Sequence, residues 1–186
     1  MSISSEKSRV VDSQVPAVNL DSRLREIFPR TLEKIERDAL TPVLQLFSER
    51  WGAEMQELEN FRFFPMFLKQ GHQAEAIVQM ADYEYLCAWV ETIDLGPWHS
   101  GVNPSWQWLP LVSGADELGK DRGVYALWKN AQTQQREEKC LTPREAELLW
   151  MITEEVTLTP DLRKAYQREI DSFQKQGLIA LDFAAI

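Results

Sequence analysis

Apolar residues recur every three or four positions through most of the first half of the chain, which is typical of helices that bury one face. The Thr41-Pro42 pair predicts an N-cap followed by a proline at the first helical position, so we expect a helix from there to about Trp51. The stripe that precedes it consists of Leu24, Ile27, Phe28, Leu32 and Ile35. The aromatic cluster that follows it is expected to lie in the core and consists of Phe61, Phe63, Phe64 and Phe67.

The clearest helical pattern covers residues 74–94, AEAIVQMADYEYLCAWVETID. Glu84 and Glu91 fall outside its apolar stripe, and we expect both to face solvent. Asp82 and Glu84 are interpreted as a solvated face rather than a paired acid–base site, because alternate positions on a helix point in different directions. The stripe itself consists of Val78, Ala81, Tyr85, Trp89 and Ile93.

The pattern changes after Gly96-Pro97, where turn residues replace helical periodicity. Residues 105–111 and 124–128 alternate as β-strands do, and the polar residues 130–139 predict a turn followed by a solvent-facing returning strand. We therefore expect a small antiparallel sheet in the second half.

Two capped helices and a closing strand complete the chain. A capping box is predicted at Thr142 and Glu145, and a second capped helix begins at Thr159. Gly177 is expected to end that helix, and residues 178–183 predict a strand. Sheet, helix, turn, helix and strand in this order are the outline of a winged-helix domain.

The predicted fold class is α+β, with three segments along the chain. Residues 1–20 are predicted to be a mobile tail because they lack periodicity. Residues 21–97 are expected to form a helical lobe, and residues 98–186 a winged-helix-like lobe with the small antiparallel sheet.

Composition and charge narrow the class of function. The chain has 186 residues, 44% hydrophobic and 26% charged, which are the proportions of a globular protein. No run approaches the ~20 apolar residues of a membrane span, and the N-terminus lacks a secretory signal pattern, so a cytoplasmic localisation is expected. The net charge of −9 disfavours nucleic-acid binding, because that affinity rests largely on Lys and Arg contacts to phosphate.

No catalytic or metal-binding constellation is visible in the sequence. His72 and His99 have no Cys, Asp or Glu at the short spacings of zinc or non-haem iron sites, and His72 is expected in a solvated turn. Neither Cys87 nor Cys140 lies in a nucleophile motif, and both are expected to be reduced. We therefore expect no catalytic residue, no metal ligand and no cofactor in this chain, and we interpret it as a binding protein.

The aromatic residues around the predicted strands allow two interpretations, which the sequence leaves open. They either fill the core between sheet and helices or line a groove beside an exposed strand edge, where an extended peptide can add a strand. Trp98 and His99, in the turn segment before the sheet, are candidate contacts with a partner protein. The candidate residues for peptide binding are Trp106, Trp108, Tyr125, Leu127 and Trp128.

Several segments, in order, resemble one family. The run FFPMFLKQ followed by AEAIVQMADYEYLCAWVE resembles the "FP-x-FL … LAD-x-E-x-A" core of the small partner proteins of multinuclear non-haem iron peptide-modifying oxidases. That family includes the methanobactin-type and thiaglutamate-type partners and longer relatives described as DNA-binding proteins. Downstream, the resemblance continues in NPSWQWLPL, in GVYALWKNAQTQQREEKCLTPREAELLWMI and in GLIAL, and it covers residues 28–181.

The resemblance implies a non-catalytic recognition subunit. Such a subunit pairs with an iron oxidase and presents a ribosomally synthesised precursor peptide for oxidative modification of a cysteine. The iron is then expected in the oxidase, and the winged-helix-like lobe is expected to recognise the peptide. Most of the N-terminal helical region of the long relatives is missing here, and only an "FP-x-T" at Phe28, Pro29 and Thr31 resembles it.

Two other classes of function remain as alternatives. A winged-helix DNA-binding transcriptional regulator is favoured by three basic residues on the second capped helix, Arg163, Lys164 and Arg168. The net negative charge of the chain opposes this alternative. Phosphate contacts would make its binding weaken steeply with salt, whereas strand addition is much less salt-sensitive. An enzyme of unknown type is disfavoured, because the sequence shows no recognisable set of catalytic or metal-binding residues.

Overall fold

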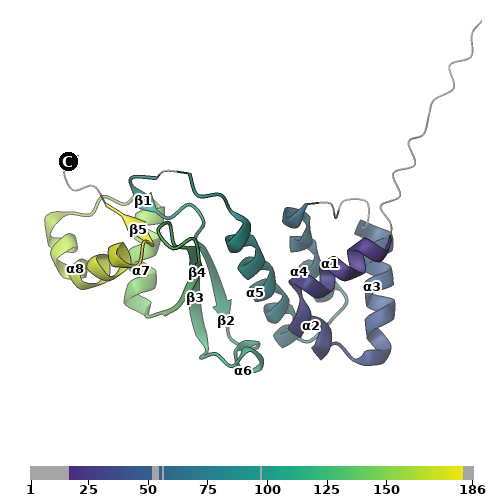
Figure 1. Cartoon of the computed structure of the whole chain (residues 1–186). Coiled ribbons are helices and arrows are strands. Elements are labelled where there is room, and N and C mark those ends of the chain that lie inside the picture. Colours follow the sequence, from purple (N-terminus) through teal and green to yellow (C-terminus); the bar gives the residue numbers. More distant parts are fainter. Residues whose placement is uncertain (1–16, 52–54, 56, 97, 182–186) are drawn as a thin grey trace, which may run out of the picture.

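The protein has an N-terminal helical region, whose last helix, α5, packs against a C-terminal region of sheets and helices (Figure 1). The computed structural model describes residues 17–51, 55, 57–96 and 98–181. The predicted α+β class is confirmed. The helical region comprises α1 (Ala17–Ile27), α2 (Pro29–Lys34), α3 (Arg37–Trp51), the 3-10 helix η1 (Leu58–Arg62), α4 (Phe63–Gln70) and α5 (Glu75–Thr92). The rest comprises β1 (Gly101–Val102), β2 (Gln107–Leu111), α6 (Ala115–Leu118), β3 (Gly123–Lys129), β4 (Arg136–Leu141), α7 (Pro143–Thr153), α8 (Pro160–Lys175) and β5 (Ile179–Ala180).

The N-terminal boundaries differ in two places from the prediction. α1 begins at Ala17, so the end of the predicted tail is helical, while residues 1–16 lie outside the described residues. The predicted helix start at Thr41-Pro42 is wrong, because α3 begins at Arg37 and contains Pro42. The carbonyl of Glu36 accepts the first helical bonds, and Pro42 withholds only one N–H bond from the second turn.

Of the aromatic cluster predicted to lie in the core, Phe61 and Phe64 are buried there, whereas Phe63 and Phe67 are partly buried against it. Phe28, Phe47, Phe61 and Phe64 are fully buried. The Phe64 ring lies 4.8 Å from that of Phe28 and 5.0 Å from that of Phe47, measured between centroids. These contacts join the junction between α1 and α2 to α3 and α4 around one centre.

α5 belongs to two cores at once. Val78 and Ala81 lie in the core of the helical region. Met80, Cys87 and Val90 lie in a second core, which α5 forms with the sheet. α5 therefore buries two faces and connects the two regions, whereas an amphipathic helix buries only one face.

Glu84 is buried, which contradicts the prediction that it faces solvent; Glu91 is exposed, as predicted. The Glu84 carboxylate accepts hydrogen bonds from the backbone N–H groups of Arg30 (2.9 Å) and Thr31 (3.0 Å). These N–H groups belong to the first turn of α2, where a negative charge is favourable. A side chain of α5 thus caps a helix 54 residues away in the sequence.

We expect Glu84→Gln to lower the free energy of unfolding by about 1–3 kcal/mol, because one of two charge-assisted acceptors is lost at a buried position. Urea denaturation followed by circular dichroism measures the loss. Glu91→Gln on the same helix is the control: its ion pair with Arg136 is partly exposed, and we expect a change below about 1 kcal/mol. Equal losses for the two variants would contradict the capping role.

Three strands form an antiparallel sheet in the order β2-β3-β4. The central strand β3 is buried on both faces: Tyr125 and Leu127 pack toward α5, whereas Ala126 and Trp128 pack toward α7 and α8. The sheet is therefore a middle layer between α5 on one side and the C-terminal helices on the other (Figure 1).

The C-terminal helices follow the sequence prediction closely. The Thr142–Glu145 capping box opens α7, and the Thr159 hydroxyl accepts from the Leu162 N–H at the start of α8. Gly177 adopts φ 68° directly after α8, as a left-handed helix end requires. The closing strand β5 pairs with β1 in a separate two-stranded sheet, so it does not extend the β2-β3-β4 sheet.

Candidate binding site at an open sheet edge

The outer edge of β2 has no strand partner among the described residues, because β2 pairs with β3 alone. Leu109 and Leu111 point toward α5 and are buried. The alternate side chains point to the other face and are exposed: Trp108 by 62%, Val112, just past the strand, by 50%, and Pro110 between them. Large apolar side chains beside unpaired backbone groups are features of a site for strand addition.

The opposite edge of the sheet has a different character. β4 carries the sequence REEKCL, and charged side chains along an edge strand oppose pairing with another strand. β2 carries QWLPL, which has no charged side chain; its Pro110 is compatible with an edge strand but offers no N–H to an added strand. Because its exposed side chains are apolar rather than charged, β2 is the better candidate of the two edges, and a segment added there would lack one main-chain hydrogen bond at Pro110.

The structure separates the five residues predicted for peptide binding. Trp108 lies exposed on β2, and Trp106 is half-buried against the core around α7 and α8. Tyr125, Leu127 and Trp128 are 6%, 0% and 1% exposed, so the groove interpretation is wrong for these three, which fill the core. Their strand is central, so neither of its faces reaches solvent.

The predicted partner contacts lie in the segment between α5 and β1. Trp98 is half-buried and His99 is exposed. Their role in binding a partner stays a prediction. His72 is exposed at a turn with φ 57°, as expected for a solvated loop.

Gln79 fastens the end of β2 to α5. Its Oε1 atom accepts hydrogen bonds from the backbone N–H groups of Val112 (2.9 Å), Ser113 (2.9 Å) and Gly114 (3.1 Å). A Cβ atom on Gly114 would lie 2.9 Å from the Ala76 carbonyl oxygen, so only glycine permits this close approach. The sequence prediction missed both Gln79 and Val112. Pro110 was the available signal, because a proline inside a strand pattern indicates an edge strand.

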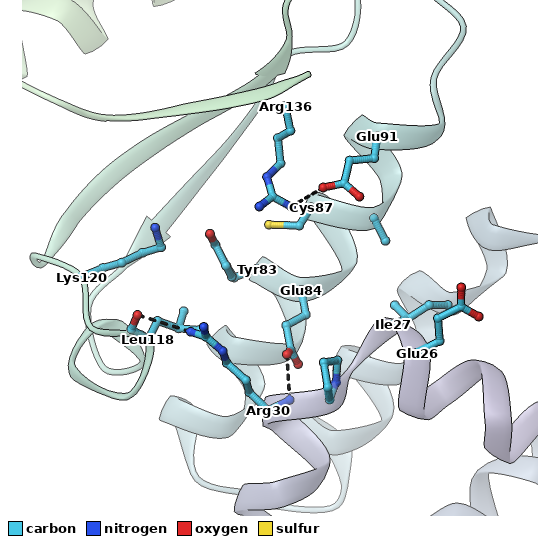
Figure 2. A pocket seen from close by; sticks show the side chains of 12 residues that line it. Glu26, Ile27, Arg30, Tyr83, Glu84, Cys87, Glu91, Leu118, Lys120 and Arg136 are labelled. Atoms are coloured by element: carbon cyan, nitrogen blue, oxygen red, sulfur yellow. Dashed lines mark hydrogen bonds and ion pairs between the residues drawn. The ribbon is translucent and has the colours of Figure 1, made fainter. Parts of the chain in front are cut away.

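A polar cavity of about 350 Å³ lies between the two regions (Figure 2). Its charged groups are largely paired with one another. Arg136 donates to Glu91 at 2.7 Å, Tyr83 donates its hydroxyl to Glu138 at 2.7 Å, and Lys120 forms an ion pair with Glu138. The lining residues are Glu26, Ile27, Pro29, Arg30, Tyr83, Glu84, Cys87, Ala88, Glu91, Leu118, Lys120 and Arg136.

Burial and hydrogen bonds shift the pKa values of Cys87 and Tyr83 in the cavity and of Glu138 beside it. It raises the pKa of the Cys87 thiol to about 11, and burial together with the Glu138 hydrogen bond raises the pKa of Tyr83. Burial acts to raise the pKa of Glu138 as well, but the hydrogen bonds from Lys120 and Tyr83 lower it overall. The thiol therefore stays protonated near neutral pH and is a weak nucleophile.

The described residues contain no group of three or more His, Cys, Asp or Glu side chains placed to hold a metal ion. Within the same residues, no helix has the length and hydropathy needed to cross a membrane. Comparison with known protein families and with characterised proteins finds no match to this chain.

Proposed function

We propose that this chain is a non-catalytic recognition subunit, which binds an extended peptide segment along the open edge of β2. The observation that carries the proposal is the exposed apolar face at this edge, with Trp108 and Val112 on either side of Pro110. Main-chain hydrogen bonds would supply much of the affinity, and the alternate side chains would supply specificity.

Trp108 is the proposed anchor of the bound segment. Trp108 is 62% exposed, whereas Leu109 and Leu111 on the same strand are buried. Aromatic side chains that become covered on binding often dominate the energy of an interface. The rigid sheet beneath it limits the ordering cost of binding, because β3 is packed on both faces.

The family resemblance supports the identity of the partners. It implies that the bound segment belongs to a ribosomally synthesised precursor peptide, and that a multinuclear non-haem iron oxidase modifies a cysteine of that peptide. In this proposal the chain holds the peptide and raises its effective concentration at the iron site, which belongs to the oxidase. Trp98 and His99 are the proposed oxidase contacts, at the turn between α5 and β1.

Co-purification tests the assembly. The chain is expressed with its genomic neighbours and isolated by a tag on this chain alone, and the eluate is assayed for iron and for a second protein. Recovery of a stable iron-containing complex is the expected result. Recovery of the chain alone, with DNA binding that weakens steeply as salt rises, would instead favour a regulator that uses α8.

Trp108→Ala is expected to weaken capture of the co-expressed peptide by at least about tenfold while leaving the unfolding midpoint unchanged. Isothermal titration with the purified peptide measures the first quantity, and thermal denaturation the second. Trp150→Ala is the matched control, because Trp150 is exposed by 58% on α7 and lies outside the β2 edge. Equal affinities for the Trp108→Ala variant and the unmodified chain would exclude this edge as the binding site.

A further inference from the structure

α5 lies along β2 and runs in the opposite direction. Near its N-terminal end, Gln79 binds the backbone just past the end of β2. At its C-terminal end, the Lys129 ammonium donates to the carbonyl oxygens of Glu91 (3.1 Å) and Ile93 (2.8 Å). Lys129 follows Leu127, which pairs with the first residue of β2, so this end of α5 lies near the start of β2. One flank of the helix must then face β4 and the other the open edge.

The contacts assign the two flanks. Tyr83 bonds Glu138 and Glu91 pairs with Arg136, so these α5 residues face β4 and the polar cavity (Figure 2). At about 100° per residue, the opposite flank is a separate row of side chains. This row, which we call the β2 flank, consists of Gln79, Asp82, Leu86 and Ile93, and all four are half-buried.

The spacing along the β2 flank matches that of an added strand. Asp82 and Leu86 are four residues apart, or about 6 Å along the helix axis. Alternate side chains of a strand are about 6.7 Å apart, and a strand added to β2 would lie about 4.8 Å from it. Two alternate side chains of a bound segment can therefore face Asp82 and Leu86 together, while the residue between them faces Trp108 or Val112.

The chemistry of the β2 flank differs along its length. Leu86 packs partly against the core between α5 and the sheet and offers an apolar contact. Burial raises the pKa of Asp82 to about 6, against the lowering effect of Lys69, so at neutral pH it is an ionised carboxylate that has lost hydration. The whole chain carries a net charge of −9, which favours approach of a cationic segment.

We infer that the segment added to β2 is a basic one, in which a Lys or Arg side chain pairs with Asp82 and the side chain two positions away packs on Leu86. The residue between them covers Trp108 or Val112. This inference rests on the proposed peptide capture and adds to it the chemical class of the peptide. It assigns recognition of the peptide's charge to a helix rather than to the sheet that binds its backbone.

Selection from a phage-displayed library of random ten-residue peptides tests both peptide capture at β2 and the preference for a basic peptide. Phage are selected on the unmodified chain after depletion on the Trp108→Ala variant. We expect the survivors to carry Lys or Arg alternating with apolar residues. The most strongly enriched peptide is then synthesised with a fluorescent label, and we expect Asp82→Asn to weaken its binding about tenfold and Asp82→Lys to weaken it further. A peptide with Glu in place of the basic residue should bind the Asp82→Lys variant better than the unmodified chain.

The outcomes separate the two proposals. If no peptide survives the depletion, both peptide capture at β2 and the basic preference are overturned. If survivors show no basic enrichment and bind the Asp82→Asn variant equally well, peptide capture stands and the basic preference falls. A photoreactive benzoylphenylalanine supplies an independent measurement: placed at Leu86 it should crosslink the selected peptide, whereas placed at Glu91, on the β4 flank, it should not. The reverse pattern would place the peptide on the wrong side of α5 for this inference.

Discussion

Trp128→Ala is expected to lower the free energy of unfolding by about 3–5 kcal/mol, the usual range for truncating a buried tryptophan. Trp128 is 1% exposed and is the largest fully buried side chain of the core between the sheet and the C-terminal helices. Its indole N–H also donates to the Gln176 carbonyl oxygen at 3.0 Å, which ties β3 to the end of α8. A domain of this size is typically stable by about 5–15 kcal/mol, so this one change would remove a large part of the total.

Two comparisons decide whether packing causes the loss. Trp128→Phe keeps most of the apolar volume but removes the hydrogen bond to Gln176, and we expect it to cost about 1–2 kcal/mol. Trp108→Ala, on the neighbouring strand, is expected to change the unfolding free energy by less than about 0.5 kcal/mol. Guanidinium titrations of the three variants give the values directly. If Trp108→Ala cost as much as Trp128→Ala, the assignment of one residue to the surface and the other to the core would be wrong.

Helices that begin with capping residues were predictable from the sequence, because a capping signal is contained within a few residues. Thr142 and Glu145 specify the start of α7 by a reciprocal pair of hydrogen bonds, and Thr159 does the same for α8 with one. The Thr41-Pro42 prediction failed for the converse reason. A proline is also tolerated early in a helix, and α3 begins at Arg37, so that Ala39 and Leu40, which precede the pair, already pack against the helical core.

The site was only partly predictable, because alternation in a strand does not reveal which face is covered. Trp106, Trp108 and Trp128 have similar local contexts, yet they are half-buried, exposed and buried. Strand order distinguishes Trp128 from Trp108, since β3 is central and β2 is at the edge, while Trp106 lies just before β2. Strand order depends on which segments pair across the chain.

Glu84 shows the same limit for a single residue. Within its own helix it looks like a solvated carboxylate, but the first turn of α2, 54 residues earlier, supplies two N–H donors. Residues 28–31 and 81–84 therefore meet in space. Glu84 thereby stabilises the contact between α2 and α5, and α5 in turn holds the end of β2 through Gln79.

Asn103→Asp is expected to lower the free energy of unfolding by about 3–5 kcal/mol at neutral pH, because it places a charge in a fully buried hydrogen-bond network. Asn103 is 0% exposed, and its Nδ2 atom donates to the carbonyl oxygens of Lys129 and Gly177, both at 2.9 Å. Its Oδ1 atom accepts from the backbone N–H (2.9 Å) and the hydroxyl (2.7 Å) of Ser105. One side chain thus connects the segment before β2 to the ends of β3 and α8.

The loss should depend on pH in a defined direction. A carboxylate at position 103 would face two carbonyl oxygens, so its folded-state pKa would rise above the ordinary value of about 3.9. Protonation restores one donor, so the variant should be closest to the unmodified protein near pH 4 and lose stability as pH rises through the raised pKa. Urea titrations at pH 4.5, 6 and 8 measure this trend. Asn103→Ala is the control: it loses the same bonds without a titrating group, so its deficit should be nearly constant over this range. If the stability loss of the Asn103→Asp variant were equally independent of pH, position 103 would not be a buried site that requires a hydrogen-bond donor.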